Sequence, residues 1–141
     1  MANEFARNRT DSSINPALIA LPAGASTTVN GASIDLSANT AFHATVELEL
    51  VSSSSTLSTS ALPDTRTLTY TLQESTDDIS FTDVFILSKA NMVGGGGIGD
   101  TANTARFRLP SDISQYIRVE CVSGTSVGDC SGSTMALTMR F

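Results

Sequence analysis

The chain has 141 residues, of which 8 are Lys or Arg and 14 are Asp or Glu, so its formal net charge is −6. Apolar residues make up 40% and charged residues 16%, and there are 20 Ser and 18 Thr. The acidic excess repels phosphate backbones, which excludes a basic nucleic-acid-binding protein. The apolar fraction excludes a disordered chain, and the shortage of charged helix formers excludes a coiled coil. The length predicts one domain.

Residues 1–16 are polar and show no hydrophobic period. They predict an extended N-terminal arm that ends at Asn15-Pro16, followed by a single domain over residues 17–141. No apolar run reaches the 18 residues of a membrane span, so we expect no membrane association. The arm also lacks the apolar stretch of a signal peptide, and we expect synthesis in a cytoplasm.

From residue 17 onward apolar and polar residues alternate with period two, which is typical of half-buried strands. In residues 41–51, for example, Leu48 and Leu50 share one face, and Glu47 and Glu49 share the other. The alternation and the turn residues between runs predict eight strands, over residues 17–21, 26–36, 41–51, 65–74, 81–87, 104–109, 113–122 and 134–141.

The same alternation predicts the fold class. Strands with one polar face favour antiparallel sheets, and no segment has a convincing helical period. We therefore expect an all-β antiparallel sandwich, and specifically an eight-strand jelly roll. An immunoglobulin-like sandwich is the alternative, but it would have a core Trp and this chain has no Trp. Turns are expected at Asn30-Gly31 and over residues 75–80, and a long loop over residues 88–103.

Two sets of residues raise the question of catalysis. His43 shares the outward face of its run with Glu47, which would suit a histidine–carboxylate dyad. Glu47 and Glu49 would suit glycoside hydrolysis, although such enzymes usually carry aromatic platforms for sugars. No sequence signature supplies a nucleophile, so a solvated charged face is the favoured interpretation. We expect no catalytic residue and no cofactor.

Two further motifs resemble ligand sites. Asp77, Asp78 and Asp83 flank a turn and could hold calcium, but Asp in a turn commonly caps its own backbone. Gly94, Gly96 and Gly99 match G-x-G-x-x-G, yet a strand and not a helix is expected to follow, so a flexible loop tip is the favoured interpretation.

Four arginines lie on polar phases of the predicted strands: Arg106, Arg108, Arg118 and Arg140. If their strands are neighbours, they form a basic patch on an acidic protein. The patch could dock an acidic protein surface, or it could pair with Glu47, Glu49 and Glu120 within one sheet. The sequence leaves both alternatives open.

The two cysteines, Cys121 and Cys130, are separated by turn-forming residues and could face each other across a hairpin. Two free thiols are favoured over a disulfide, because no feature indicates secretion. With His43 as the one histidine, the cysteines cannot complete a four-ligand zinc site without carboxylates. We expect no bound metal.

Two segments carry a family resemblance. Residues 68–84, LTYTLQESTDDISFTDV, run from a strand through a Ser-Thr-Asp-Asp turn to a strand, and residues 105–124, ARFRLPSDISQYIRVECVSG, place Tyr116 to Val119 before a turn and a closing apolar strand. This order resembles the capsid decoration (cement) proteins of tailed phages, like that of the Bordetella phage. The resemblance covers residues 17–141, and the chain departs from it in residues 52–60 and 94–99.

The resemblance implies a structural virion protein that binds the major capsid protein on the capsid exterior, forms dimers or trimers and has no active site. For the capsid contact we expect the arm, with Phe5, Arg7 and Arg9, together with the loops at residues 52–60 and 94–99. Arg106 and Arg108 are further candidates. A glycan- or receptor-binding module of a phage tail or bacterial surface is the alternative function, and a scarcity of aromatic residues, at 6%, counts against it.

Overall fold

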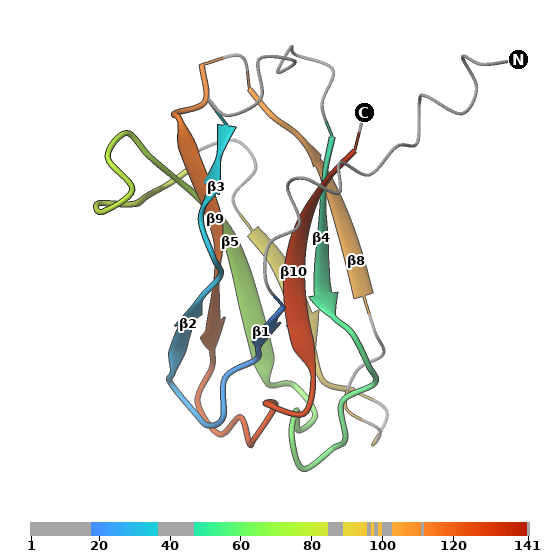
Figure 1. Cartoon of the computed structure of the whole chain (residues 1–141). Coiled ribbons are helices and arrows are strands. Elements are labelled where there is room, and N and C mark those ends of the chain that lie inside the picture. Colours follow the sequence, from blue (N-terminus) through green and yellow to red (C-terminus); the bar gives the residue numbers. More distant parts are fainter. Residues whose placement is uncertain are drawn as a thin grey trace, which may run out of the picture.

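The computed structural model describes residues 18–36, 47–84, 89–95, 97, 99, 103–110 and 112–140. These residues form two antiparallel sheets that pack face to face (Figure 1). The four-stranded sheet contains, in order, β1 (Ile19–Ala20), β10 (Thr134–Arg140), β4 (Glu47–Ser53) and β8 (Asn103–Arg108). The six-stranded sheet contains β2 (Thr28–Asn30), β9 (Tyr116–Ser123), β5 (Thr67–Ser75) and β6 (Thr82–Asp83), with β3 (Ile34–Asp35) beside β9 and β7 (Lys89–Val93) beside β5. The predicted all-β sandwich is confirmed.

The strand pairing is that of a jelly roll. β2 and β3 both pair with β9, and β6 and β7 both pair with β5, so each pair acts as one interrupted strand. The first of the resulting eight strands then pairs with the eighth, the second with the seventh, the third with the sixth, and the fourth with the fifth. This is a long antiparallel ribbon rolled into two sheets, and β10–β4 and β9–β5 pairing closes the sheets.

Alternation in the sequence fixes which side of each strand faces the core. Along β9 every second residue is buried, and Ile117, Val119 and Cys121 are at most 2% exposed. The described inward residues of β4, β5 and β10 are also buried, namely Leu48, Leu50, Leu68, Tyr70, Leu72, Met135 and Leu137. Burial of these aliphatic side chains is the main stabilising contribution, about 1.5–3 kcal/mol for each one fully removed from water.

The outward face of β5 is more covered than period two predicts. Thr71 and Gln73, which lie on its polar phase, are 4% and 6% exposed. Gln73 is covered because its side chain contacts Asp83 on β6 and Arg118 on β9, at 3.1 and 2.9 Å. A central strand flanked on both sides by long polar side chains buries its own polar face as well.

Two predicted loop features are wrong. Asn30-Gly31 is not a hairpin turn, because Gly31 N–H donates to Val119 O at 2.7 Å and the chain keeps β9 as its partner on both sides. The predicted loop over residues 88–103 contains β7, which pairs with Thr67 to Thr71 of β5. β7 was missed in the sequence because it ends directly before the glycine run that starts at Gly94, and that run indicated a loop.

No helix in the described part of the chain is long and apolar enough to cross a membrane. The arm, residues 1–16, lies outside the described residues.

Replacing Leu50 by Ala should lower the free energy of unfolding by about 2–5 kcal/mol, because this side chain is 2% exposed in the core and its truncation leaves a cavity. Leu18→Ala is the control, since Leu18 is 68% exposed and should change stability by no more than about 0.5 kcal/mol. Urea unfolding at neutral pH measures both. Equal losses for the two variants would contradict the assignment of the core.

Candidate functional site

The loop between β1 and β2, residues 21–27, reaches one end of the sandwich, the lower end in Figure 1. Three further loops gather there. They are residues 54–66 between β4 and β5, the described residues of 94–99 between β7 and β8, and residues 124–133 between β9 and β10. We call this surface the loop end. Residues 52–60 and 94–99, the segments in which the sequence departs from the family resemblance, both contribute to the loop end. Nothing in the sequence of residues 124–133 predicted that they would belong to the same surface.

Hydrogen bonds cross-link these loops. Gly94 N–H donates to Arg66 O at 2.9 Å, and Gly97 N–H donates to the Asp64 carboxylate at 3.1 Å. The Thr59 hydroxyl donates to Gly97 O. From the third loop, Gly128 N–H donates to Ala61 O at 2.8 Å. The loop end is therefore a connected surface, and not a set of independent loops.

Three glycines make this packing possible. A Cβ atom on Gly94 would lie 2.3 Å from Pro63 O, one on Gly99 2.1 Å from Leu57 O, and one on Gly128 2.1 Å from Ser60 O. These distances are far inside van der Waals contact, so no larger residue fits without moving backbone. The prediction of a flexible loop tip is wrong for Gly94 and Gly99, which are buried where two backbones approach each other.

The serine tract at residues 52–60 divides into two roles. Ser52 and Ser53 are 1% exposed. The buried Ser133 hydroxyl contacts the Ser53 and Ser54 hydroxyls, at 3.1 and 3.3 Å, and accepts the Ser55 N–H at 3.2 Å. These serines hold the β4–β5 loop against the start of β10. The tract also leaves an exposed rim of hydroxyl-bearing residues, Ser54, Ser55, Thr56, Ser58, Thr59 and Ser60. Within this rim the hydroxyls of Ser54, Ser58, Thr59 and Ser60 also bond to other groups of the protein.

A depression of about 230 Å³ lies within the loop end. It is lined by Ser55, Thr56, Leu57, Ser58, Ala61, Asp129, Cys130, Gly132 and Ser133. Four of these nine residues are Ser or Thr, and the lining includes no aromatic ring on which a sugar would stack.

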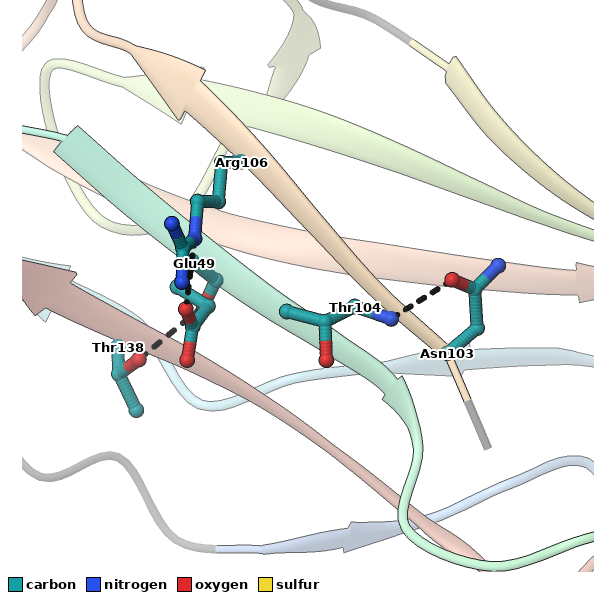
Figure 2. A network of polar contacts seen from close by, with 5 residues as sticks. All are labelled: Glu49, Asn103, Thr104, Arg106 and Thr138. Carbon is teal, nitrogen blue, oxygen red and sulfur yellow. Dashed lines mark hydrogen bonds and ion pairs between the residues drawn. The ribbon is translucent and has the colours of Figure 1, made fainter. Parts of the chain in front are cut away.

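The arginines do not form one patch. Arg106 on β8 pairs with Glu49 on β4 at 3.0 Å between Nε and Oε2, and the Thr138 hydroxyl donates to Glu49 O at 3.2 Å (Figure 2). Glu49 is thereby covered to 9% exposure, although it lies on the predicted outward face. Pairing within the sheet is the alternative that holds for Arg106.

The other arginines divide between the two sheets. Arg108 on β8 and Arg140 on β10 both lie opposite Glu47 of β4 in the strand register. Arg118 belongs to β9 of the six-stranded sheet, so a patch that joins it to Arg106 and Arg108 is wrong. The error arose because sequence phase gives the polar face of a strand but not the sheet that contains it.

Of the aspartates around residues 75–83, Asp77 acts as a turn cap, and Asp83 accepts a hydrogen bond from the Gln73 side chain. The Asp77 carboxylate accepts hydrogen bonds from Ser80 N–H, Ile79 N–H and the Ser75 hydroxyl, each at 2.9 Å. These bonds, that from Ser80 first, hold the pKa of Asp77 below its usual value. Within the described ranges no group of three His, Cys, Asp or Glu residues could hold a metal ion. The capping interpretation is confirmed for Asp77.

Both cysteines are buried free thiols, as favoured from the sequence. Desolvation by burial raises the pKa of Cys121 from 9.0 to about 12, against the opposing effect of a hydrogen bond with Tyr70. Burial likewise raises the pKa of Cys130, whose thiol donates to Ala61 O at 3.4 Å. A thiol with a raised pKa is a poor nucleophile, so these residues serve packing.

The remaining predicted site residues, Phe5, Arg7, Arg9 and His43, lie outside the described residues. Sequence reasoning missed Ile79, an exposed apolar residue in the turn between β5 and β6. Its signal was a single apolar residue inside the otherwise polar stretch STDDIS.

No protein-family model matches the chain, and no curated protein matches it in sequence. The function must therefore be argued from the surfaces of this chain and from the resemblance in its sequence.

Replacing Gly99 by Ala should destabilise the loop end by about 1–3 kcal/mol. The residue has φ +78°, which costs an L side chain about 1–2 kcal/mol, and its Cβ would collide with Leu57 O. Gly95→Ala is the matched control, because no atom lies within 4 Å of its Cβ position. Thermal unfolding and amide exchange of residues 57–61 test this. Equal protection in the two variants would contradict it.

The raised pKa of Cys121 predicts a loss of stability in alkali. Well below pH 9.0 the thiol is protonated in both the folded and the unfolded state. Above it the unfolded chain loses the proton first, so the free energy of unfolding falls as pH rises toward 12, by up to about 1.4 kcal/mol per pH unit. Urea unfolding between pH 7 and pH 10.5 should show a shallower pH dependence for Cys121→Ala than for the wild type. Parallel curves would contradict the prediction.

Proposed function

We propose that this protein decorates and stabilises the capsid of a tailed phage by binding the major capsid protein on the outer surface of the shell. It is made in the cytoplasm of the bacterial host and carried in the virion. The proposal includes a dimeric or trimeric state at symmetry axes of the shell. It requires a rigid scaffold with contact surfaces and no active site, as in the decoration proteins that the sequence resembles.

The observation that carries the proposal is the cross-linked loop end. Its hydrogen-bonded loops are already ordered, so docking them costs little conformational entropy. Its exposed hydroxyl groups both donate and accept hydrogen bonds. Over residues 54–66, 94–99 as described and 124–133, the charged residues are Asp64, Arg66 and Asp129, so binding removes few charges from water.

The shell itself strengthens such binding. A capsid presents many identical sites, and an oligomer that engages several of them gains effective concentration without new contacts. Modest affinity for each copy therefore suffices. The alternative function, glycan binding, has weaker support, because the depression in the loop end is lined without an aromatic residue.

Co-sedimentation with capsids that lack the protein tests the proposal. We expect saturable binding at a fixed ratio to capsid subunits, and an increase in the temperature at which the shell disrupts. Thr56→Glu, which places a charge in the exposed hydroxyl rim of the loop end, should weaken binding at least tenfold. Thr28→Glu makes the same change at an exposed position of β2 and should leave binding unchanged.

The arm is tested in the same assay by deleting residues 1–16. Loss of binding in the deletion variant assigns the arm to the contact, and full binding leaves the loop end as the contact. No binding by the wild-type protein would overturn the proposed function and direct the search to glycan arrays.

A further inference from the structure

The turn between β5 and β6 projects beyond the six-stranded sheet (Figure 1). We call residues 76–81 the hairpin loop. Residues 76–80 are all exposed, and Ile79 is 82% exposed, more than Leu18 or Val93, the other large apolar residues exposed in the described part of the chain. Single exposed apolar residues are common on protein surfaces, so exposure alone does not make a contact site. The hydrogen bonds that order this loop are a second observation in favour of a contact site.

The hairpin loop is ordered by its own hydrogen bonds. The Asp77 carboxylate binds the Ile79 and Ser80 N–H groups on one side and the Ser75 hydroxyl on the other. Ser75 is 3% exposed, so it anchors the loop to the sheet. Asp78 has φ +59°, a conformation that Asp tolerates better than most residues. The side chain of Ile79 is therefore presented at a fixed place.

A second set of contacts fixes the base of the loop. The Arg118 guanidinium stacks on the Phe81 ring at 3.9 Å from its centroid. Arg118 Nε also donates to the Gln73 side chain at 2.9 Å, and Gln73 donates in turn to the Asp83 carboxylate at 3.1 Å. The loop is thus tied to β9, β5 and β6, and binding through it requires no ordering step.

The charge around Ile79 restricts the partner. Residues 74–83 include Glu74, Asp77, Asp78 and Asp83 and no Lys or Arg. Asp77 and Asp78 directly precede Ile79 in the chain, and both are exposed. An exposed apolar side chain that follows two exposed carboxylates fits a hollow that is apolar inside and basic at its rim.

The hairpin loop lies far from the loop end. β5 runs from Thr67, beside the loop end, to Ser75, at the hairpin loop. Nine residues of strand span about 27 Å at about 3.4 Å per step. The two surfaces are therefore too far apart to share one small contact area.

We propose that Ile79 docks into a basic-rimmed apolar hollow on a capsid subunit adjacent to the one bound by the loop end, so that one decoration protein bridges two subunits. This inference rests on the proposed function and assigns the hairpin loop as its second contact. Bridging gives the stabilisation a physical cause, because separating the two subunits then requires breaking one of the two contacts.

Titrated co-sedimentation with capsids that lack the protein, combined with shell melting, tests the proposal. Ile79→Ser should weaken binding about tenfold or more, as expected for removing a buried aliphatic side chain from an interface, and should abolish most of the increase in shell disruption temperature. Ile79→Val keeps an apolar side chain and should remain within about threefold of the wild type. Because Ile79 is exposed, both variants should unfold at the wild-type temperature in the absence of capsids.

Asp78→Asn tests the basic rim separately. Asn also tolerates a positive φ, so the loop keeps its shape while one carboxylate is lost. Binding should weaken and should become less sensitive to salt than that of the wild type. An unchanged salt dependence would overturn the basic rim.

The outcomes separate this inference from the proposed function. Wild-type binding together with equal binding and equal shell stabilisation by Ile79→Ser would overturn the bridge and leave the decoration function intact. A change in the oligomeric state of Ile79→Ser, with its capsid affinity unchanged, would also overturn the bridge, because the loop would then bind a second copy of this chain. No capsid binding by the wild type would overturn both proposals.

Discussion

The antiparallel ladder between β5 and β9 is the element on which the other features depend. It pairs Leu68 to Ser75 with Ser123 to Tyr116, the longest register among the residues that the structure describes. Its inner face contributes Leu68, Tyr70 and Leu72 opposite Ile117, Val119 and Cys121 to the core. Its outer face carries the contact between Gln73 and Arg118, and at its lower end Gly124 N–H donates to Thr67 O at 2.9 Å. Core, hairpin loop and loop end are thus joined by one ladder.

The abundance of Ser, Thr and Gly has a structural explanation at the loop end. In a loop such residues usually indicate flexibility, yet here they allow close packing. Gly94, Gly99 and Gly128 admit neighbouring carbonyl groups that any side chain would exclude. Ser133 lies buried among the hydroxyls and backbone of the serine tract, where an apolar residue would leave those groups without partners. Small polar residues therefore add to the apolar packing that Leu57, Leu62 and Val127 provide in these loops.

The fold could be predicted from the sequence because alternation is a local property. Each strand of a jelly roll with one wet face carries its own period, and β4, β9 and β10 showed it clearly. β7 could not be found in this way, since its five residues adjoin a glycine run and its pairing with β5 is decided by tertiary contacts. The length and polarity of the loops could be predicted from the sequence. That the loops meet at one end could not, because the hydrogen bonds between them join distant residues, such as Gly128 and Ala61, which are 67 positions apart.

The candidate site residues were likewise predictable where their contacts are local in the sequence, and not where the contacts are long-range. The Asp77 cap was predictable, because a turn residue that binds its own backbone acts within three positions. The placement of Arg118 was not predictable, because its partners Gln73 and Phe81 lie about 40 residues away along the chain and come together through the β5–β9 register. The positions of the arginines on the polar faces of their strands therefore left a single basic patch open as an alternative, whereas the strands that carry them belong to two different sheets.

The distance between the loop end and the hairpin loop bears on how such a protein would stabilise a shell. A coat protein held by one surface adds the free energy of that contact to a single subunit and does not oppose movement between neighbours. A bridge opposes that movement only if the connection between its two contacts is stiff, since a flexible linker would extend before either contact was strained. Here the connection is β5, a central strand bonded to β9 on one side and to β6 and β7 on the other. Stretching or bending it would break several ladder hydrogen bonds together, so force at either contact is transmitted through the sheet.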